Sequence, residues 1–168
     1  MTNRPTNRSQ SAEELAKELI PAQKLKQIIT EQTPESTEAL VSSAEVIGKR
    51  LAKIVPTSQG VPTSQGVTTS QIRNIFGTVR MIEQEVQALA ESDPLPVPVQ
   101  RSLQMLRPKL AYQYGRAQDR NKVEMGALMM ILSDAISLVG SSVPNFRNFM
   151  DFFEAILAYH RYAGGKTN

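Results

Sequence analysis

Residues 122–139 read KVEMGALMMILSDAISLV, and this stretch decides the fold. Its apolar residues fall on nearly every side of a helical projection: Val123, Ala127, Leu128, Met130, Ile131, Leu132, Ala135, Ile136 and Val139. A helix that is apolar all round has to be surrounded by other elements, because a surface helix keeps one polar face. The stretch therefore predicts the central helix of a bundle, ended by the Gly-Ser-Ser sequence at 140–142.

A second apolar helix is predicted directly after this stretch, over about 144–162, with two glycines at 164–165 closing it. Phe152 and Tyr159 lie off its main apolar line and are candidates for a protein interface. The residues expected to point inward are Phe146, Phe149, Phe153, Ile156 and Leu157.

Two more helices are predicted upstream of the central stretch. Thr68 and Gln71 form a capping box for the first, in which each side chain accepts from the other residue's backbone. Three prolines within 93–98 interrupt that helix, and the next one has a kink or a fresh start at Pro108. The apolar residues of the first step by three and four: Ile72, Ile75, Val79, Ile82, Val86 and Leu89.

The N-terminal third contains further helix signals and a repeat. Ser11 caps one helical pattern, which breaks at Pro21, and the sequence Thr-Pro-Glu at 33–35 starts another. The hexapeptide VPTSQG occurs at 55–60 and again at 61–66, and VTTSQI follows at 67–72. Only the last copy precedes a helix, so the first two are expected to be an extended and mobile linker.

These signals predict an all-α fold without a β segment. The expected organisation is a disordered tail at 1–10, an N-terminal helical extension at 11–55 and a linker rich in Pro, Gly, Ser and Thr at 56–67. A compact bundle of about four to six helices follows at 68–166. The pattern leaves open whether 11–55 packs on the bundle, extends it or reaches a neighbouring subunit.

The composition argues against an enzyme that works alone. The chain has no cysteine and one histidine, and it lacks a Gly-rich phosphate loop, a metal-ligand spacing and a G-x-S-x-G sequence. No cofactor and no metal are therefore expected. The lone His160 borders an apolar face, so a buried core histidine is favoured over a ligand contact. No apolar run is long enough to cross a membrane, and a cytoplasmic protein without membrane contact is expected.

Basic residues are concentrated in one part of the chain. Residues 99–122 hold six cations and one carboxylate, whereas 123–160 hold one cation and four carboxylates. At about 100° per residue, Lys109, Tyr112, Arg116 and Arg120 fall near one line of a helix, away from its apolar stripe. Such a row suits the phosphates and bases of a single-stranded nucleic acid, although a merely solvated face is the alternative.

Other cations are candidates for the same surface. Arg73 and Arg80 are seven residues apart and so share a helix face, and Arg107 extends the basic row. Arg161 and Lys166 either contact a nucleic-acid backbone or balance the negative end of the last helix. A homo-oligomeric helical scaffold or adaptor without nucleic-acid contact is the second hypothesis. A DNA-binding regulator ranks last, because the cations follow a long helix flank rather than the start of a short recognition helix.

Three motifs carry a family resemblance: Thr68-Thr69-Ser70-Gln71-Ile72-Arg73, Leu106-x-Pro108-Lys109-Leu110-Ala111-Tyr112-x-Tyr114-Gly115-Arg116, and Phe149-x-x-Phe152-Phe153-Glu154-Ala155-Ile156-x-Ala158-Tyr159-His160-x-x-x-Gly164-Gly165. In this order and spacing they resemble the small-subunit family of type III-A (Csm-type) CRISPR interference complexes. The resemblance covers about residues 66–166, whereas 1–65 and the hexapeptides depart from the compact family pattern.

The resemblance implies a helical bundle without catalytic activity that serves in antiviral defence. Several copies would stack head to tail in a ribonucleoprotein with the other subunits of the effector complex and line the channel where guide RNA pairs with single-stranded target RNA. Carried over by motif, Arg73, Lys109, Tyr112 and Arg116 would face RNA. Arg120, Arg107 and Arg101 extend that surface on physical grounds only. Because base pairing supplies specificity, the contacts would go to the RNA backbone.

Overall fold

Helices dominate the computed structural model, which describes residues 10–167. The disordered tail expected at 1–10 lies, apart from Gln10, outside the described residues. In chain order the elements are α1 (Ala12–Leu19), α2 (Ala22–Thr30), α3 (Pro34–Ala52), β1 (Ile54–Val55), β2 (Thr63–Ser64), α4 (Thr69–Val86), α5 (Val97–Gln104), α6 (Leu106–Arg116), the 3₁₀ helix η1 (Asp119–Asn121), α7 (Lys122–Val139) and α8 (Val143–Tyr162).

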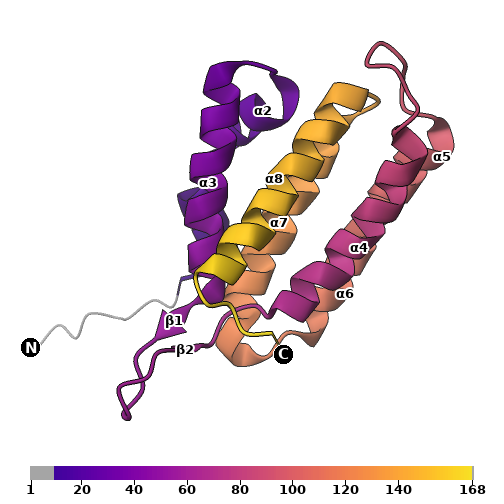
Figure 1. The fold of residues 1–168 in the computed structure, drawn as a ribbon. Helices are drawn as coiled ribbons and strands as arrows, with labels where there is room; N and C mark the ends of the chain where they lie inside the picture. The colour runs from indigo at the N-terminus through magenta and orange to yellow at the C-terminus, as the bar shows by residue number, and fades with distance from the viewer. Residues whose placement is uncertain (1–9, 168) are drawn as a thin grey trace, which may run out of the picture.

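The central helix is confirmed. α7 has the predicted bounds, buries residues on several sides, and packs against α1, α2, α6 and α8. Gly140 ends it with φ 58° and ψ −127°, a conformation that suits glycine. Figure 1 shows α8 in front of α7, with α3 on one side and α4 on the other. Five α-helices lie within 68–166, as expected for the bundle.

The last helix is covered more completely than its apolar line predicts. Phe152 is fully buried, so the suggestion that it serves a protein interface is wrong. The reason is that α2 and α3 pack against α8 in addition to α4 and α7. Gly48 of α3 allows the closest approach: a Cβ there would lie 2.6 Å from the backbone nitrogen of His160 and 2.9 Å from the carbonyl oxygen of Ile156.

Local signals placed most helix ends correctly. Capping boxes start α1 at Ser11, α3 at Thr33 and α4 at Thr68, and the break at Pro21 separates α1 from α2. The fresh start expected at Pro108 occurs two residues earlier, because α6 begins at Leu106. Pro108 then lies in the first turn. A backbone N–H there has no partner within the helix, so the lack of an N–H in proline costs no helical hydrogen bond.

The question left open about residues 11–55 has a clear answer within the described chain. α1 and α2 pack on α7, and α2 and α3 pack on α8. Leu15, Ile29 and Ile47 belong to the same apolar cluster as Leu128 and Phe153. The N-terminal helices therefore lie on the bundle and share its core. The division of the chain at 55 and 67 remains a prediction.

The expectation of no β segment was wrong. β1 and β2 form an antiparallel hairpin in which Ile54 pairs with Ser64 and Val55 with Thr63. The second hexapeptide copy is held in place because the Gln65 N–H donates to Lys53 O at 3.0 Å and the Val67 N–H to Leu51 O at 2.9 Å. Lys53 turns the chain back at the end of α3 with a left-handed φ of 44°.

Two glycines provide a matched test of this packing. We expect Gly48→Ala to lower the free energy of unfolding by about 1–3 kcal/mol, because its Cβ collides with backbone atoms of α8. Gly77→Ala should instead raise it by up to about 1 kcal/mol, because Gly77 is exposed inside α4 with open space around the added Cβ. Urea denaturation measures both, and equal effects would contradict the close α3–α8 contact.

Candidate nucleic-acid interface

The basic row of α6 faces solvent, as predicted. Lys109, Tyr112 and Arg116 are exposed, and Tyr112 as a whole residue is 61% exposed. Leu106 and Leu110 on the other side of the helix are buried in the core. The two stripes read from the sequence thus separate a packed face from a free one.

The side chains of this row contact uncharged groups. The Arg116 guanidinium lies 5.4 Å from the centre of the Tyr112 ring. The Lys109 ammonium lies 3.4 Å from the hydroxyl of Thr78 on α4. Within residues 10–167, no carboxylate oxygen lies within 4.0 Å of the charged nitrogens of Lys109, Arg116 or Arg107. These cations therefore keep their charge available for an external anion.

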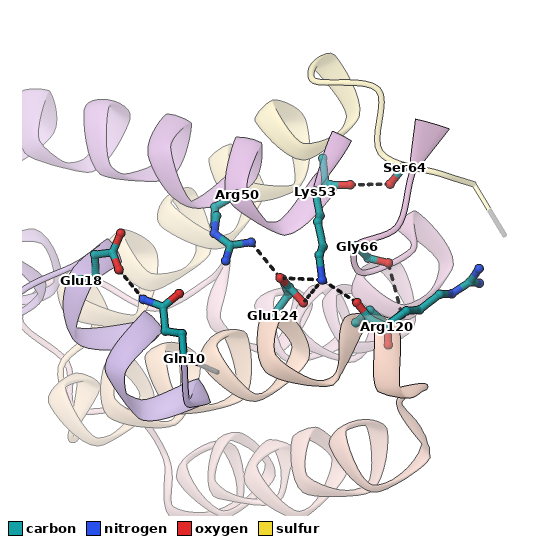
Figure 2. A network of polar contacts seen from close by, with 10 residues as sticks. Gln10, Glu18, Arg50, Lys53, Ser64, Gly66, Arg120 and Glu124 are labelled. Atoms are coloured by element: carbon teal, nitrogen blue, oxygen red, sulfur yellow. Dashed lines mark hydrogen bonds and ion pairs between the residues drawn. The ribbon is translucent and has the colours of Figure 1, made fainter. Parts of the chain in front are cut away.

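Arg120 does not continue the row. α6 ends at Arg116, and Ala117 is extended and buried, so Arg120 lies in η1 on a different element. The helical projection failed here because it assumed one unbroken helix from Lys109 to Arg120. Lys53 fixes the backbone of η1 by donating from Nζ to Arg120 O at 2.7 Å, while the Arg120 side chain points away from this contact (Figure 2).

Beside this contact lies a buried carboxylate that sequence reasoning missed. Glu124 is 2% exposed, and its Oε1 lies 2.7 Å from Arg50 Nη1 and 3.3 Å from Lys53 Nζ (Figure 2). It stands in the first turn of α7, where the helix dipole also favours a negative charge. The one sequence signal was a carboxylate in a largely apolar helix, because both partners lie more than 70 residues away.

Arg73 and Arg80 of α4 belong to a different side from Lys109. Arg80 pairs with Glu83 at 3.0 Å and lies 5.9 Å from the ring of Phe76, which packs edge-on against Phe153 of α8. Thr78, the contact of Lys109, is two residues from Arg80 and therefore about 160° away around the helix. Arg73 is exposed and shares the side of Arg80. The structure thus does not join the two groups into one row.

Arg161 and Lys166 lie beside the N-terminus of α4. The Thr69 N–H donates to Lys166 O at 2.7 Å, which places the C-terminal tail on the first turn of that helix. Arg161 donates to the hydroxyl of Thr167 at 2.9 Å, within the same tail. Both cationic side chains are exposed.

His160 is a core histidine, as favoured from the sequence. Its ring is fully buried, and Nε2 lies 2.6 Å from Val67 O, so Nε2 carries the proton and donates. Nδ1 has no partner within the described residues. Burial lowers the pKa of His160 below 6.5, and nearby Arg161 lowers it further, against the opposing effect of the Val67 hydrogen bond.

The described residues offer little for other chemistry. Between 10 and 167 there is no cluster of three or more His, Cys, Asp or Glu side chains that would suit a metal ion. Over the same residues, no helix has the length and apolar character needed to cross a bilayer.

A comparison with protein families identifies the chain at this point. The family model described as Csm2 Type III-A matches residues 34–166. The chain belongs to the Csm2 Type III-A family. It is therefore a subunit of a type III-A CRISPR effector complex, as the sequence motifs suggested. No curated protein matches the chain.

The Csm2 match extends further than the motif resemblance did. It starts at Pro34, the first residue of α3, so the matched region includes residues 34–65. The hairpin and its duplicated hexapeptide lie inside the matched range, whereas α1 and α2 precede it.

His160 generates a prediction about acid stability. Because folding lowers its pKa, the unfolded chain takes up a proton below about pH 6.5 that the folded chain resists. We expect the free energy of unfolding to be unaffected by His160 above that pH and to fall by up to about 1.4 kcal/mol per pH unit below it. Urea titrations between pH 7 and 5.5 measure this fall.

His160→Gln removes the titrating group while keeping a donor for Val67 O. Since the chain has a single histidine, the variant should show a flat profile over the same pH range. An equal slope in both proteins would show that another group is responsible.

Proposed function

We propose that this chain is a non-catalytic, RNA-binding structural subunit of the cytoplasmic type III-A effector in antiviral defence. It holds the guide–target RNA duplex by sequence-independent contacts to the backbone, and several copies stack along the complex. The observation that carries the RNA contact is the exposed α6 row of Lys109, Tyr112 and Arg116, which no described carboxylate neutralises.

The chemistry of this row fits RNA. Lys109 and Arg116 supply two positive charges to the phosphate backbone, and binding releases the counterions that the phosphates had condensed. The exposed Tyr112 ring adds a flat apolar surface that can pack against a ribose or a base. Nothing in this arrangement distinguishes one base from another, which is adequate where guide–target pairing selects the sequence.

Stacking is supported by opposite charge at the two ends of the bundle. At one end, α3, α6 and α8 finish and α4 and α7 begin (Figure 1). This basic end, made of residues 49–73, 116–124 and 160–167, has nine cations and two carboxylates. The cations are Lys49, Arg50, Lys53, Arg73, Arg116, Arg120, Lys122, Arg161 and Lys166.

The opposite end carries an excess of carboxylates. This acidic end, made of residues 22–38, 83–98 and 134–154, has ten carboxylates and three cations. Burial and the neighbouring carboxylates of Glu154 and Glu83 raise the pKa of Asp151, one of its members. The carboxylates are Glu31, Glu35, Glu38, Glu83, Glu85, Glu91, Asp93, Asp134, Asp151 and Glu154. Facing the basic end of one copy, such a surface attracts it and fixes a head-to-tail direction.

The RNA contact is tested by reversing two charges. We expect Lys109→Glu with Arg116→Glu to weaken binding of a labelled RNA by at least about tenfold. The dependence of log K on log salt should become shallower by about 1.4, since each lost phosphate contact removes about 0.7 for a single strand. Electrophoretic mobility shifts at several salt concentrations measure both quantities.

Lys24→Glu with Lys26→Glu is the matched control. Both lysines are exposed on α2, so the net charge changes equally but at the other end of the molecule. This control should bind RNA almost as the original chain does. Unchanged binding by the α6 variant would favour the scaffold or adaptor function instead, and equal loss in both variants would indicate a nonspecific charge effect.

The stacking is tested by salt. We expect the RNA-free chain at high concentration to sediment as multimers at about 50 mM salt and to dissociate towards monomers at about 500 mM, where charges are screened beyond a few ångströms. Sedimentation velocity gives the mass distribution. Monomers under all conditions would contradict stacking driven by the two ends, and multimers insensitive to salt would contradict its electrostatic origin.

A further inference from the structure

The hairpin, residues 54–64, extends from the basic end beyond the helices (Figure 1). We call it the arm. It contains no charged residue, and near its tip Val61 is 68% exposed beside the exposed Pro62. An uncharged, partly apolar projection at an end crowded with cations is suited to a contact with another surface rather than to a phosphate backbone.

The two hexapeptide copies differ in how they contact the rest of the chain. The second copy is fixed by its contacts with the end of α3, and Gly66 has no room for a Cβ beside the carbonyl of Leu51. The first copy, of the same sequence, makes the exposed turn, where Thr57 Oγ1 donates to Val61 O at 2.7 Å. Packing within the chain accounts for Ser64, Gln65 and Gly66 of the second copy. It leaves Val61, Pro62 and the turn made by the first copy without a role in the bundle.

A groove lies at the N-terminal end of α3, opposite the end from which the arm extends. It has a volume of about 570 Å³ and opens between α2, the start of α3 and α8. Ile28, Leu40 and Val41 provide apolar walls. Polar groups also line the groove, among them Thr33, Thr37, Asn148, Glu31 and Asp151.

The arm and the groove are related by α3. The arm follows the C-terminus of α3 at Lys53, and the groove includes residues from its first two turns. α3 has 19 residues and so is about 28 Å long. Moving a second copy along this axis by about one bundle length brings the arm of one to the groove of the next. The same movement places the basic end against the acidic end.

We propose that the arm of one copy inserts Val61 and Pro62, which lie beside its turn, into the α2–α3–α8 groove of the next copy. This inference rests on the proposed stacking and names the surfaces that make it. The contact is heterologous, since arm and groove are different surfaces, and it therefore propagates into an open row rather than closing into a symmetric dimer.

The absence of cysteine from the sequence allows a direct test. We expect full-length chains with Val61→Cys to crosslink with full-length chains with Val41→Cys when mixed at about 50 mM salt and oxidised with copper phenanthroline. Disulfide formation requires Cα atoms within about 7 Å. The mixture should give dimers on a non-reducing gel, and the double variant Val61→Cys/Val41→Cys should give a ladder of multimers.

Four outcomes would overturn the inference. Val61→Cys crosslinking to itself would indicate arm-to-arm contact. Equal crosslinking with Ala111→Cys, an exposed position on α6, would indicate random collision. Multimers in sedimentation without an arm–groove crosslink would refute this contact and leave the stacking intact, whereas monomers under all conditions would refute the stacking as well.

A second measurement shortens the arm, so that Val61 and Pro62 lie against the end of α3, without touching the bundle. Deletion of residues 55–60 leaves one hexapeptide copy with Ser64, Gln65, Gly66 and Val67 in their observed contacts. We expect unchanged urea denaturation and at least a tenfold weaker association in sedimentation. Val61→Asp should weaken association as well, because it brings a carboxylate to the acidic end, whereas Val46→Asp, at an exposed position of α3, should not. Unchanged association of both arm variants would refute the proposal.

Discussion

The need to cover α7 on all sides determines the arrangement of the other helices. A helix with apolar residues around its circumference exposes hydrocarbon wherever a neighbour is missing, at about 25 cal/mol for each Å². α1, α2, α6 and α8 supply that cover. This requirement draws the N-terminal helices into the core, and it leaves α6 with one packed face and one free face. The basic row is exposed because α6 is an outer helix.

The ends of the helices organise the charge. α3, α6 and α8 finish where α4 and α7 begin, so helix dipoles of opposite sense meet at each end of the bundle. Since dipoles of opposite sense meet there, the positive charge of the basic end comes from its cationic side chains and not from the helix dipoles. Glu124 lies at that end but is paired with Arg50 and Lys53, so it links α7 to the end of α3. Because its carboxylate is buried, it reduces the positive charge exposed to solvent only slightly.

Sequence patterns predicted what is encoded locally. The N-caps at Ser11 and Thr33, the capping box at Thr68 and the bounds of α7 are set by neighbours within a few residues, and the structure confirms them. The helical projection also oriented Lys109 and Arg116 correctly. It failed for Arg120, because the break after Arg116 depends on burial of Ala117 in the tertiary structure.

The features that sequence reasoning missed depend on distant contacts. Phe152 is covered by helices placed far earlier in the chain, and Glu124 is paired with residues of α3. The hairpin has two-residue strands, too short for any alternation to be visible, and it forms because residues 64–67 bond to the end of α3. The separation of Arg80 from Lys109 likewise follows from how α4 is turned against α6 and α8.

The number of tandem hexapeptides determines the length of the arm. Repeated coding sequence gains and loses whole units during replication, and exposed loop tips tolerate such changes. Each added unit would lengthen both strands by three residues, or about 10 Å of reach, while the unit beside Val67 keeps its place. In the proposed stack, the spacing between neighbouring copies would change with the number of units, without any alteration to the hydrophobic interior.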